Sequence, residues 1–469
     1  MARPLRLHPD RLLPVDPDRR AIARRLLDTV SGMPLLSPHG HVDAGMLLAD
    51  EPFRDPLDLL VTPDHYVTRL LHASGVDLRR LGVGTELDEA AARAGWREVC
   101  ARWQVFAGTP VALWLTAELV ELFGVQTRPS AETADAIWET VAAQLATDEF
   151  RPRALLARFG VEVLATTDDP ASDLAAHRAL AADPGVGTRV LPTFRPDRYL
   201  DPGRPGWADD VDRLGEAAGV DTGHYAGFVE ALERRRGAFA AAGATAADHG
   251  PRDAGTASLT LEQATRVFRD ARAGRHTTSD AVALSRHLLC EMGRMSSEDG
   301  LTMAVHPGVL RNHHRPTSAA LGVDTGHDIP VRVEYTEALR PLLERYGTSP
   351  RLRLVLFTVD ESAWSRELAP LAGFYPAVHL GAPWWYLDAP DAIRRARAAV
   401  TETAGISRLA GFVDDTRALC SIPARHDMAR RLDAGWLAGL VAEHRLEEDE
   451  AFAAMTALVD EQPRRVWGL

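Results

Sequence analysis

Short apolar runs recur along the chain and are separated by longer segments rich in alanine, leucine and arginine. Each run is bounded by polar or turn-forming residues and has the length of a buried β-strand. The longer segments carry the 3.6-residue period of helices, most clearly at 171–183, 333–346, 390–404 and 425–443. The pattern predicts strands, of which the fourth is the weakest, at 33–41, 160–167, 187–195, 242–249, 301–307, 351–359, 377–383 and 406–415.

Strands that alternate with helices predict a parallel sheet with both faces covered. Eight such strands can close a sheet on itself, so we expect an α/β fold, a (β/α)8 TIM-like barrel. Two stretches are too long for a single crossover helix. We expect a helical insertion at about 44–158 and a smaller one at about 205–297, within a single catalytic barrel domain over residues 1–469.

The composition narrows the chemistry by exclusion. All 53 basic residues are arginine, because the sequence contains no lysine. The chain therefore has no lysine for a Schiff base, a pyridoxal-phosphate anchor, a phosphate-binding loop or a carbamylated bridge between two metal ions. With 66 acidic residues the net charge is −13, which disfavours nucleic acid as a partner.

The cysteine spacing and the hydropathy of the chain indicate in which cellular compartment the protein is expected. Cys100, Cys290 and Cys420 are far apart and form no CxxC pair, which argues against a disulfide framework or a thiolate zinc site. Residues 1–20 lack the apolar core of a secretory signal, and no run reaches the ~18 apolar residues of a membrane span. We expect a cytoplasmic protein with no membrane partner.

Polar side chains gather just after the predicted strands, where the loops of a barrel converge on one mouth. His39 and His41 follow the first strand with one glycine between them, so both imidazoles can face one ion. Asp415 ends the last strand, which neighbours the first in a closed barrel. Two histidines and a carboxylate suit Zn²⁺ or another first-row divalent ion. In the alternative interpretation, Asp415 or the adjacent Asp414 caps the following helix.

Other residues at this rim can bind a substrate or move a proton. His306 closes the fifth strand and can serve as a ligand, a proton carrier or a hydrogen-bond donor. Arg195 and Arg417 are permanently charged forks suited to a carboxylate or an enediolate oxygen, although most arginines form surface ion pairs. Trp384 and Trp385 can stack on a sugar face or fill the core.

At these residues the chain resembles the uronate isomerase (glucuronate isomerase) family, a branch of the amidohydrolase superfamily. LPTFRPD and DTGHD are the specific motifs, whereas HGH alone is not. The resemblance implies a barrel of the metal-dependent hydrolase type, and it fits the missing lysine because this branch lacks the bridging carbamylated lysine. The matching segments are HGH at 39–41, DHY at 64–66, TTDDP at 166–170, LPTFRPD at 191–197, DHG at 248–250, HPGVLRN at 306–312, DTGHD at 324–328, PWWYLD at 383–388, and DDTR with ARHDMARR at 414–431.

The resemblance implies an aldose–ketose isomerase that acts on a small hexuronate. The reactions are D-glucuronate to D-fructuronate and D-galacturonate to D-tagaturonate, by proton transfer through a cis-enediol. One divalent metal ion, with Zn²⁺ favoured, is expected on His39, His41 and Asp415. The remaining roles that follow are catalysis by Asp415, Arg417, His306 and Tyr66, and substrate contact by Arg195, Trp384, Trp385, His65 and Arg311.

Departures from the family pattern leave the substrate open. They fall at 42–44, 117–119, 313–314 and 359–361, outside the expected metal ligands. The runner-up function is a mononuclear metal-dependent hydrolase of a sugar-acid lactone or amide, because the same ligands would activate water. A non-catalytic sugar-acid binding protein is a third hypothesis. The sequence decides neither the preferred epimer nor whether the chain forms a homo-oligomer.

Overall fold

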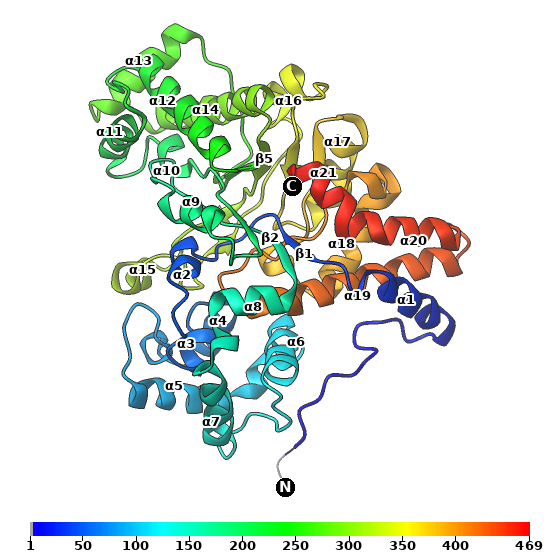
Figure 1. Ribbon diagram of the computed structural model, residues 1–469. Coiled ribbons are helices and arrows are strands. Elements are labelled where there is room, and N and C mark those ends of the chain that lie inside the picture. Colours follow the sequence, from blue (N-terminus) through cyan, green and yellow to red (C-terminus); the bar gives the residue numbers. More distant parts are fainter. Residues whose placement is uncertain (1–2) are drawn as a thin grey trace.

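The computed structural model describes residues 3–469 and shows a parallel β-barrel surrounded by helices (Figure 1). Parallel ladders join the strands in the orders β1-β2-β3 and β4-β5-β8-β9. The predicted strands from the first to the seventh correspond to these elements. Their bounds are β1 Leu35–Ser37, β2 Val161–Ala165, β3 Arg189–Leu191, β4 Ala246–His249, β5 Thr302–Val305, β8 Leu354–Leu356 and β9 Val378–Leu380.

Single backbone contacts close the ring. Phe194, just after β3, pairs in parallel with Ala247 of β4. Leu409, in the eighth predicted strand, pairs in parallel with Leu380 of β9. The backbone N–H of His41, shortly after β1, then donates a hydrogen bond to Thr416 O at 3.0 Å. The α/β barrel prediction is confirmed, including the weak fourth strand.

The eighth barrel segment differs from the expected strand. Within 406–415 only Leu409 makes a ladder pair. Gly411 and Asp415 have φ values of 85° and 42°, in the left-handed region, and turn the chain out of the extended conformation. Val413 is nevertheless buried. The apolar residues at 406–415 therefore reflect burial in the wall of the barrel and not the pairing of a regular strand.

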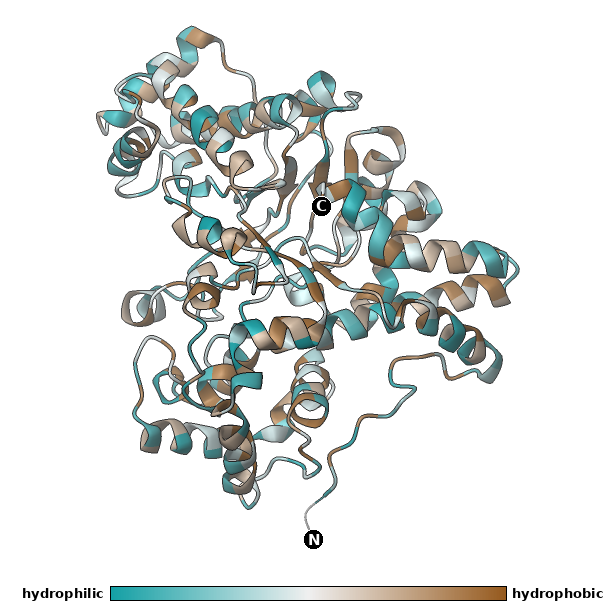
Figure 2. Cartoon of the chain, viewed as in Figure 1, coloured by the Kyte–Doolittle hydropathy of each residue, from teal (hydrophilic) through white to brown (hydrophobic). Residues whose placement is uncertain are grey.

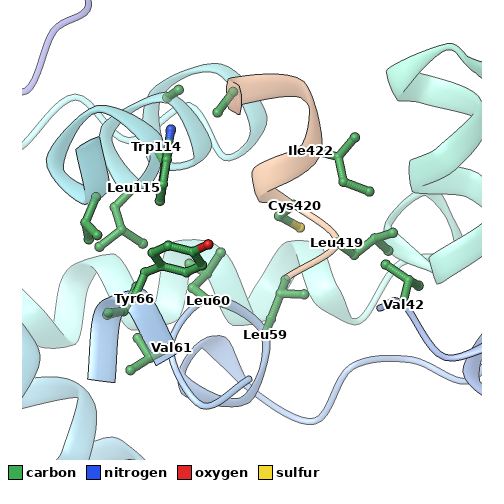
Figure 3. Packing of buried hydrophobic residues seen from close by; sticks show 14 of the residues in the cluster. Val42, Leu59, Leu60, Val61, Tyr66, Trp114, Leu115, Leu419, Cys420 and Ile422 are labelled. Atoms are coloured by element: carbon green, nitrogen blue, oxygen red, sulfur yellow. The ribbon is translucent and has the colours of Figure 1, made fainter. Parts of the chain in front are cut away.

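The residues at 44–158 form a helical lobe. Figure 1 shows α3 to α7 gathered below the barrel. Tyr66 of α4 and Trp114 of α6 pack towards Leu419 and Ile422 at the start of α19 (Figure 3), so this lobe is anchored beside the last barrel segment. The helices are α2 Ala44–Ala49, α3 Pro56–Leu60, α4 His65–Ala73, α5 Glu89–Ala101, α6 Pro110–Ala117, α7 Ala134–Leu145 and α8 Pro152–Phe159.

The region expected as a smaller insertion, 205–297, is divided by β4. Helices on both sides of that strand follow consecutive barrel strands, as in an ordinary alternation of strand and helix. The strand itself is alanine-rich, so its apolar signal is weak against its helical surroundings. The helices are α10 Asp197–Leu200, α11 Trp207–Ala218, α12 Tyr225–Ala241, α13 Leu261–Arg272 and α14 Thr278–Asp299.

The remaining helices form an outer layer. Figure 2 shows hydrophobic residues on the central strands and hydrophilic ones towards the outside. The three cysteines are buried and free. Within residues 3–469 no helix is long and apolar enough to cross a membrane. The layer consists of α1 Pro17–Val30, α9 Ala175–Ala182, α15 Arg315–Leu321, α16 Arg340–Tyr346, α17 Ala369–Phe374, α18 Pro390–Ala404, α19 Ser421–Ala442, α20 Glu448–Thr456 and α21 Gln462–Trp467.

Candidate active site

The barrel closure brings the expected metal ligands together. The segment after β1 carries His39 and His41, and the eighth segment carries Asp415. His39 Nε2 and His41 Nε2 lie 3.4 and 3.1 Å from Asp415 Oδ1. A tetrahedral zinc site with bonds of ~2.0–2.1 Å separates its donor atoms by ~3.3 Å. The donor set and its spacing therefore fit one divalent ion.

The ionisation of His41 and Asp415 agrees with a ligand role, whereas the carboxylates of Asp248 and Asp415 raise the pKa of His39 against the effect of burial. Burial lowers the pKa of His41 to about 4, so its imidazole is neutral at physiological pH. Burial acts to raise the pKa of Asp415, but its contacts with His39 and His41 outweigh this and hold it well below the usual range. Metal ligands of these types must be a neutral imidazole and an ionised carboxylate.

The alternative role of Asp415 or Asp414 as a cap of the following helix is wrong, because the N-cap of α19 is Cys420 and no side chain caps this helix. Thr416 Oγ accepts the hydrogen bond from Ala418 N at 2.9 Å. Asp414 Oδ2 lies 3.1 Å from His426 Nε2 on α19. Asp415 is thereby left facing the two histidines.

Asp248, at the end of β4, organises the opposite side of the barrel mouth. Its Oδ1 lies 2.6 Å from His306 Nδ1, and its Oδ2 lies 3.0 Å from Arg195 Nη1. The Asp248 side chain is buried, yet the positive charge of Arg195 and its two histidine neighbours, His39 and His306, hold its pKa well below the usual range against the effect of burial. His39 and His306 also stack, with ring centroids 4.8 Å apart.

A second group of three metal-binding residue types, His39, Asp248 and His306, is also close-packed. Both oxygens of Asp248 are already engaged, one by an imidazole and one by a guanidinium. We therefore interpret His39, Asp248 and His306 as a hydrogen-bonded cluster. The group of His39, His41 and Asp415 is the better candidate to bind the ion.

Arg195 is fixed in place by acidic partners. Its Nε donates to Asp197 Oδ2 at 2.8 Å, in addition to the ion pair with Asp248. A Cβ atom at Gly250 would lie 2.7 Å from Arg195 Nη2, so only glycine leaves room for the guanidinium. The arginine is thus rigid before any substrate arrives.

The loop between β5 and β8 covers another side of the mouth. It contains the short antiparallel pair β6 (Val309–Leu310) and β7 (Ile329–Pro330). Asp324 in this loop accepts a hydrogen bond from Arg417 Nη2 at 2.9 Å. Arg311 Nη1 lies 3.1 Å from Asp328 Oδ2, and its guanidinium lies 4.7 Å from the centre of the Trp385 ring.

The helical lobe supplies the last wall. His65 and Tyr66 occupy the first turn of α4, where Asp64 Oδ1 accepts a hydrogen bond from Tyr66 N at 2.8 Å. Their rings stack with centroids 4.7 Å apart, and His65 meets Trp385 edge to face at 5.5 Å. Burial lowers the pKa of His65 to about 3 and raises that of Tyr66 well above its usual value.

These walls enclose a cavity of about 460 Å³. The departures from the family pattern at 42–44, 117–119, 313–314 and 359–361 are not among its lining residues. Every site residue proposed from the sequence lines it, although the individual roles stay predictions: His39, His41, His65, Tyr66, Arg195, His306, Arg311, Trp384, Trp385, Asp415 and Arg417.

The sequence alone assigns no individual role to two acidic residues of the site. Asp248 is one of the polar residues at the end of the fourth predicted strand and opens the matching segment DHG, and Asp324 opens the matching segment DTGHD. Their partners, Arg195 and Arg417, are distant in sequence, so the position of each acid in a matching motif was the available signal. Asp324 also has a left-handed φ of 59°, as do Trp385 at 52° and Asp415. Such backbone strain is commonly found at functional sites.

Comparison with known proteins gives consistent results. The family model for glucuronate isomerase matches residues 18–461. A uronate isomerase of Rhizorhabdus wittichii is 51% identical over 96% of both chains. The crystal structure of a glucuronate isomerase from Caulobacter crescentus superimposes with a TM-score of 0.97 at 43% identity, covering 99% of this chain and 98% of the other. The uronate isomerase structure from Thermotoga maritima gives a TM-score of 0.92 at 28% identity, with 98% and 99% covered. The chain described here belongs to the glucuronate isomerase family.

Proposed function

We propose that this protein interconverts hexuronates, D-glucuronate with D-fructuronate and D-galacturonate with D-tagaturonate. The observation that carries the proposal is one cavity of about 460 Å³ that is lined both by Arg195, held by its ion pair with Asp248, and by the candidate metal ligands His39, His41 and Asp415. Family membership supports the same activity. The entire chain acts as one catalytic unit in this proposal, because the helical lobe contributes a wall of the cavity, and it acts in the cytoplasm.

Arg195 binds the C6 carboxylate of the sugar. The contacts that fix it use Nε and Nη1, and its planar fork suits a carboxylate. Trp384 and Trp385 offer aromatic faces to the sugar ring, while His65 and Arg311 contact its hydroxyls. This arrangement sets the direction of the sugar chain, with C1 and C2 towards Asp415.

His39, His41 and Asp415 would hold the divalent ion, for which Zn²⁺ is the best match to two imidazoles and one carboxylate. Bound there, it supplies Lewis-acid polarisation of the sugar carbonyl and its neighbouring hydroxyl. Inductively coupled plasma analysis should show the metal in the purified wild-type protein and its loss in the His39→Ala/His41→Ala variant. Equal metal content in the two proteins would contradict this ligand set.

The side chains of the cavity move the protons. A proton leaves C2, the carbonyl oxygen becomes a hydroxyl, and the resulting cis-enediol gains a proton at C1 as the C2 hydroxyl becomes the new carbonyl. Tyr66 or His306 carries the carbon-bound proton, and Asp415 accepts a hydrogen bond from a substrate hydroxyl. Arg417 donates to the enediolate oxygen, where negative charge is greatest in the transition state.

NMR of each uronate incubated with the purified protein tests the function. We expect the ketose to form, and in D₂O we expect deuterium at C1 or C2, because a proton held by a side chain exchanges with solvent. An unchanged sugar would contradict the proposal, and transfer without any exchange would point to a hydride shift. The corresponding lactone, in a parallel sample, tests the hydrolase alternative.

A further inference from the structure

One buried guanidinium joins the helical lobe to the barrel mouth. Arg425 lies in the first turns of α19, is fully buried, and does not line the cavity. Its guanidinium lies over the rings of Tyr66 and Trp114, two residues of the lobe that pack near Ile422 of α19 (Figure 3). Its surroundings come from segments that are distant in sequence.

On the side of the lobe, Arg425 lies between aromatic rings. Its guanidinium carbon is 3.7 Å from the centre of the Trp114 ring and 4.6 Å from that of Tyr66. Its Nη2 lies 3.8 Å from Asp64 Oδ2, and Asp64 caps the helix that carries Tyr66. Arg425 therefore contacts the Tyr66 ring directly and also lies near Asp64, whose carboxylate accepts a hydrogen bond from the Tyr66 backbone.

On the side of the barrel, the same group reaches two loops of the mouth. Nη1 donates to Asp388 Oδ2 at 2.7 Å and to Asp414 O at 3.4 Å. Asp388 directly follows the turn η6 (Trp385–Leu387), and Asp414 precedes the metal-ligand candidate Asp415. Arg425 thus connects the segments that carry Tyr66, Trp385 and Asp415.

A simple contribution to stability does not account for this arrangement. Desolvation offsets much of the attraction in a buried ion pair, so apolar replacement of both partners is often neutral. Arginine alone can stack its flat face on two rings while its edge donates to carboxylate and carbonyl oxygens, and lysine cannot. The geometry uses both properties of the guanidinium.

We propose that Arg425 is a positioning residue that holds the Tyr66 ring in the orientation needed for proton transfer. The inference rests on the role of Tyr66 in the proposed function. A small displacement of a reacting group can lower a rate by ~100-fold without weakening substrate binding. Arg425 should therefore affect kcat more than KM, and chiefly through Tyr66, the only one of these three site residues whose side chain it contacts directly.

Steady-state kinetics of Arg425→Lys, Tyr66→Phe and the double variant, each with D-glucuronate, test this coupling. We expect Arg425→Lys to lower kcat by ~10–100-fold with KM changed less than ~threefold. In the Tyr66→Phe background the same substitution should change kcat less than ~threefold, because the group it positions is already gone. The matched control is Arg397→Lys, which alters a buried Arg–Asp pair of α18 and α19 outside the cavity and should lower the melting temperature without lowering kcat.

If Arg425→Lys does not fold, the variant Arg425→Met/Asp388→Asn, which removes both charges of the ion pair, takes the place of Arg425→Lys. It is then measured with and without Tyr66→Phe in the same way. Equal losses of kcat in the two Tyr66 backgrounds, or an unchanged kcat in folded Arg425→Lys, would overturn the inference. So would a fully active Tyr66→Phe. An inactive wild-type protein would instead refute the proposed function, which keeps the two failures distinct.

Discussion

Two parts of the cavity hold their side chains by different means: the barrel wall, made by the ends of the barrel strands, and the inserted wall, made by the loop between β5 and β8 and by the helical lobe. In the barrel wall, Asp248 lies within the paired strand β4, His306 directly follows β5, and both are buried. In the inserted wall, Arg311 and Asp324 come from the loop after β5, with side chains 38% and 36% exposed, and are held by ion pairs. Strand ladders thus fix the chemistry, while side-chain pairs near solvent leave the covering wall adjustable at small cost in free energy.

Of the substitutions considered, Asp248→Asn should have the largest effect on stability and activity. Such an effect would show that the barrel wall tolerates little change. The substitution removes the buried charge that pairs with both His306 and Arg195. Breaking such a pair typically costs ~3–5 kcal/mol of stability, so the urea unfolding midpoint should fall together with kcat/KM. Asp197→Asn, at a carboxylate 30% exposed, is the control and should lose much less stability. Similar losses in the two variants would contradict a special role for Asp248.

Arg195→Lys should come next, because lysine keeps the charge but cannot reproduce the bidentate fork. We expect kcat/KM for D-glucuronate to fall by the equivalent of ~2–5 kcal/mol. The uncharged sugar D-glucose, which lacks the carboxylate, serves as a binding control in calorimetry. Wild-type kinetics for Arg195→Lys would exclude carboxylate recognition by this residue.

Arg417→Met tests where the two walls meet. A donor to an oxyanion is typically worth ~2.7–4 kcal/mol, or a ~10²–10³-fold loss of rate. Since that charge exists only in the transition state, kcat and kcat/KM should fall together with little change in KM. A raised KM with an unchanged kcat would make Arg417 a ground-state binder instead.

Asp324→Asn should have the smallest effect. It weakens the contact that holds Arg417 from the loop at 2.9 Å. Exposed ion pairs of this kind contribute ~0.2–1 kcal/mol, so kcat should fall by no more than about fivefold and the melting temperature should hardly move. A loss as large as that of Arg417→Met would show that the inserted wall is as rigid as the barrel wall.

The sequence predicted the barrel wall better than the inserted wall, for a physical reason. A strand end in a barrel must face the mouth, so His39, His306 and Asp415 follow from position alone. His65 and Tyr66 lie on a helix whose place depends on packing, and only the family resemblance nominated them as site residues. Pairings such as Arg417 with Asp324 depend on contacts between distant segments, which no local pattern encodes.

The hydrogen bond from His41 N to Thr416 O joins the first barrel segment to the last. A ribosome must therefore synthesise nearly the whole chain before the first barrel segment, which pairs with β2 on one side, can meet the eighth barrel segment on its other side. At ~5–20 residues per second, the intervening stretch occupies on the order of tens of seconds. During that time His39 and His41 are present without Asp415, so the three-ligand site can form only at the end of synthesis. Binding of an ion by all three residues would in this sense be a late step of folding, coupled to closure of the barrel.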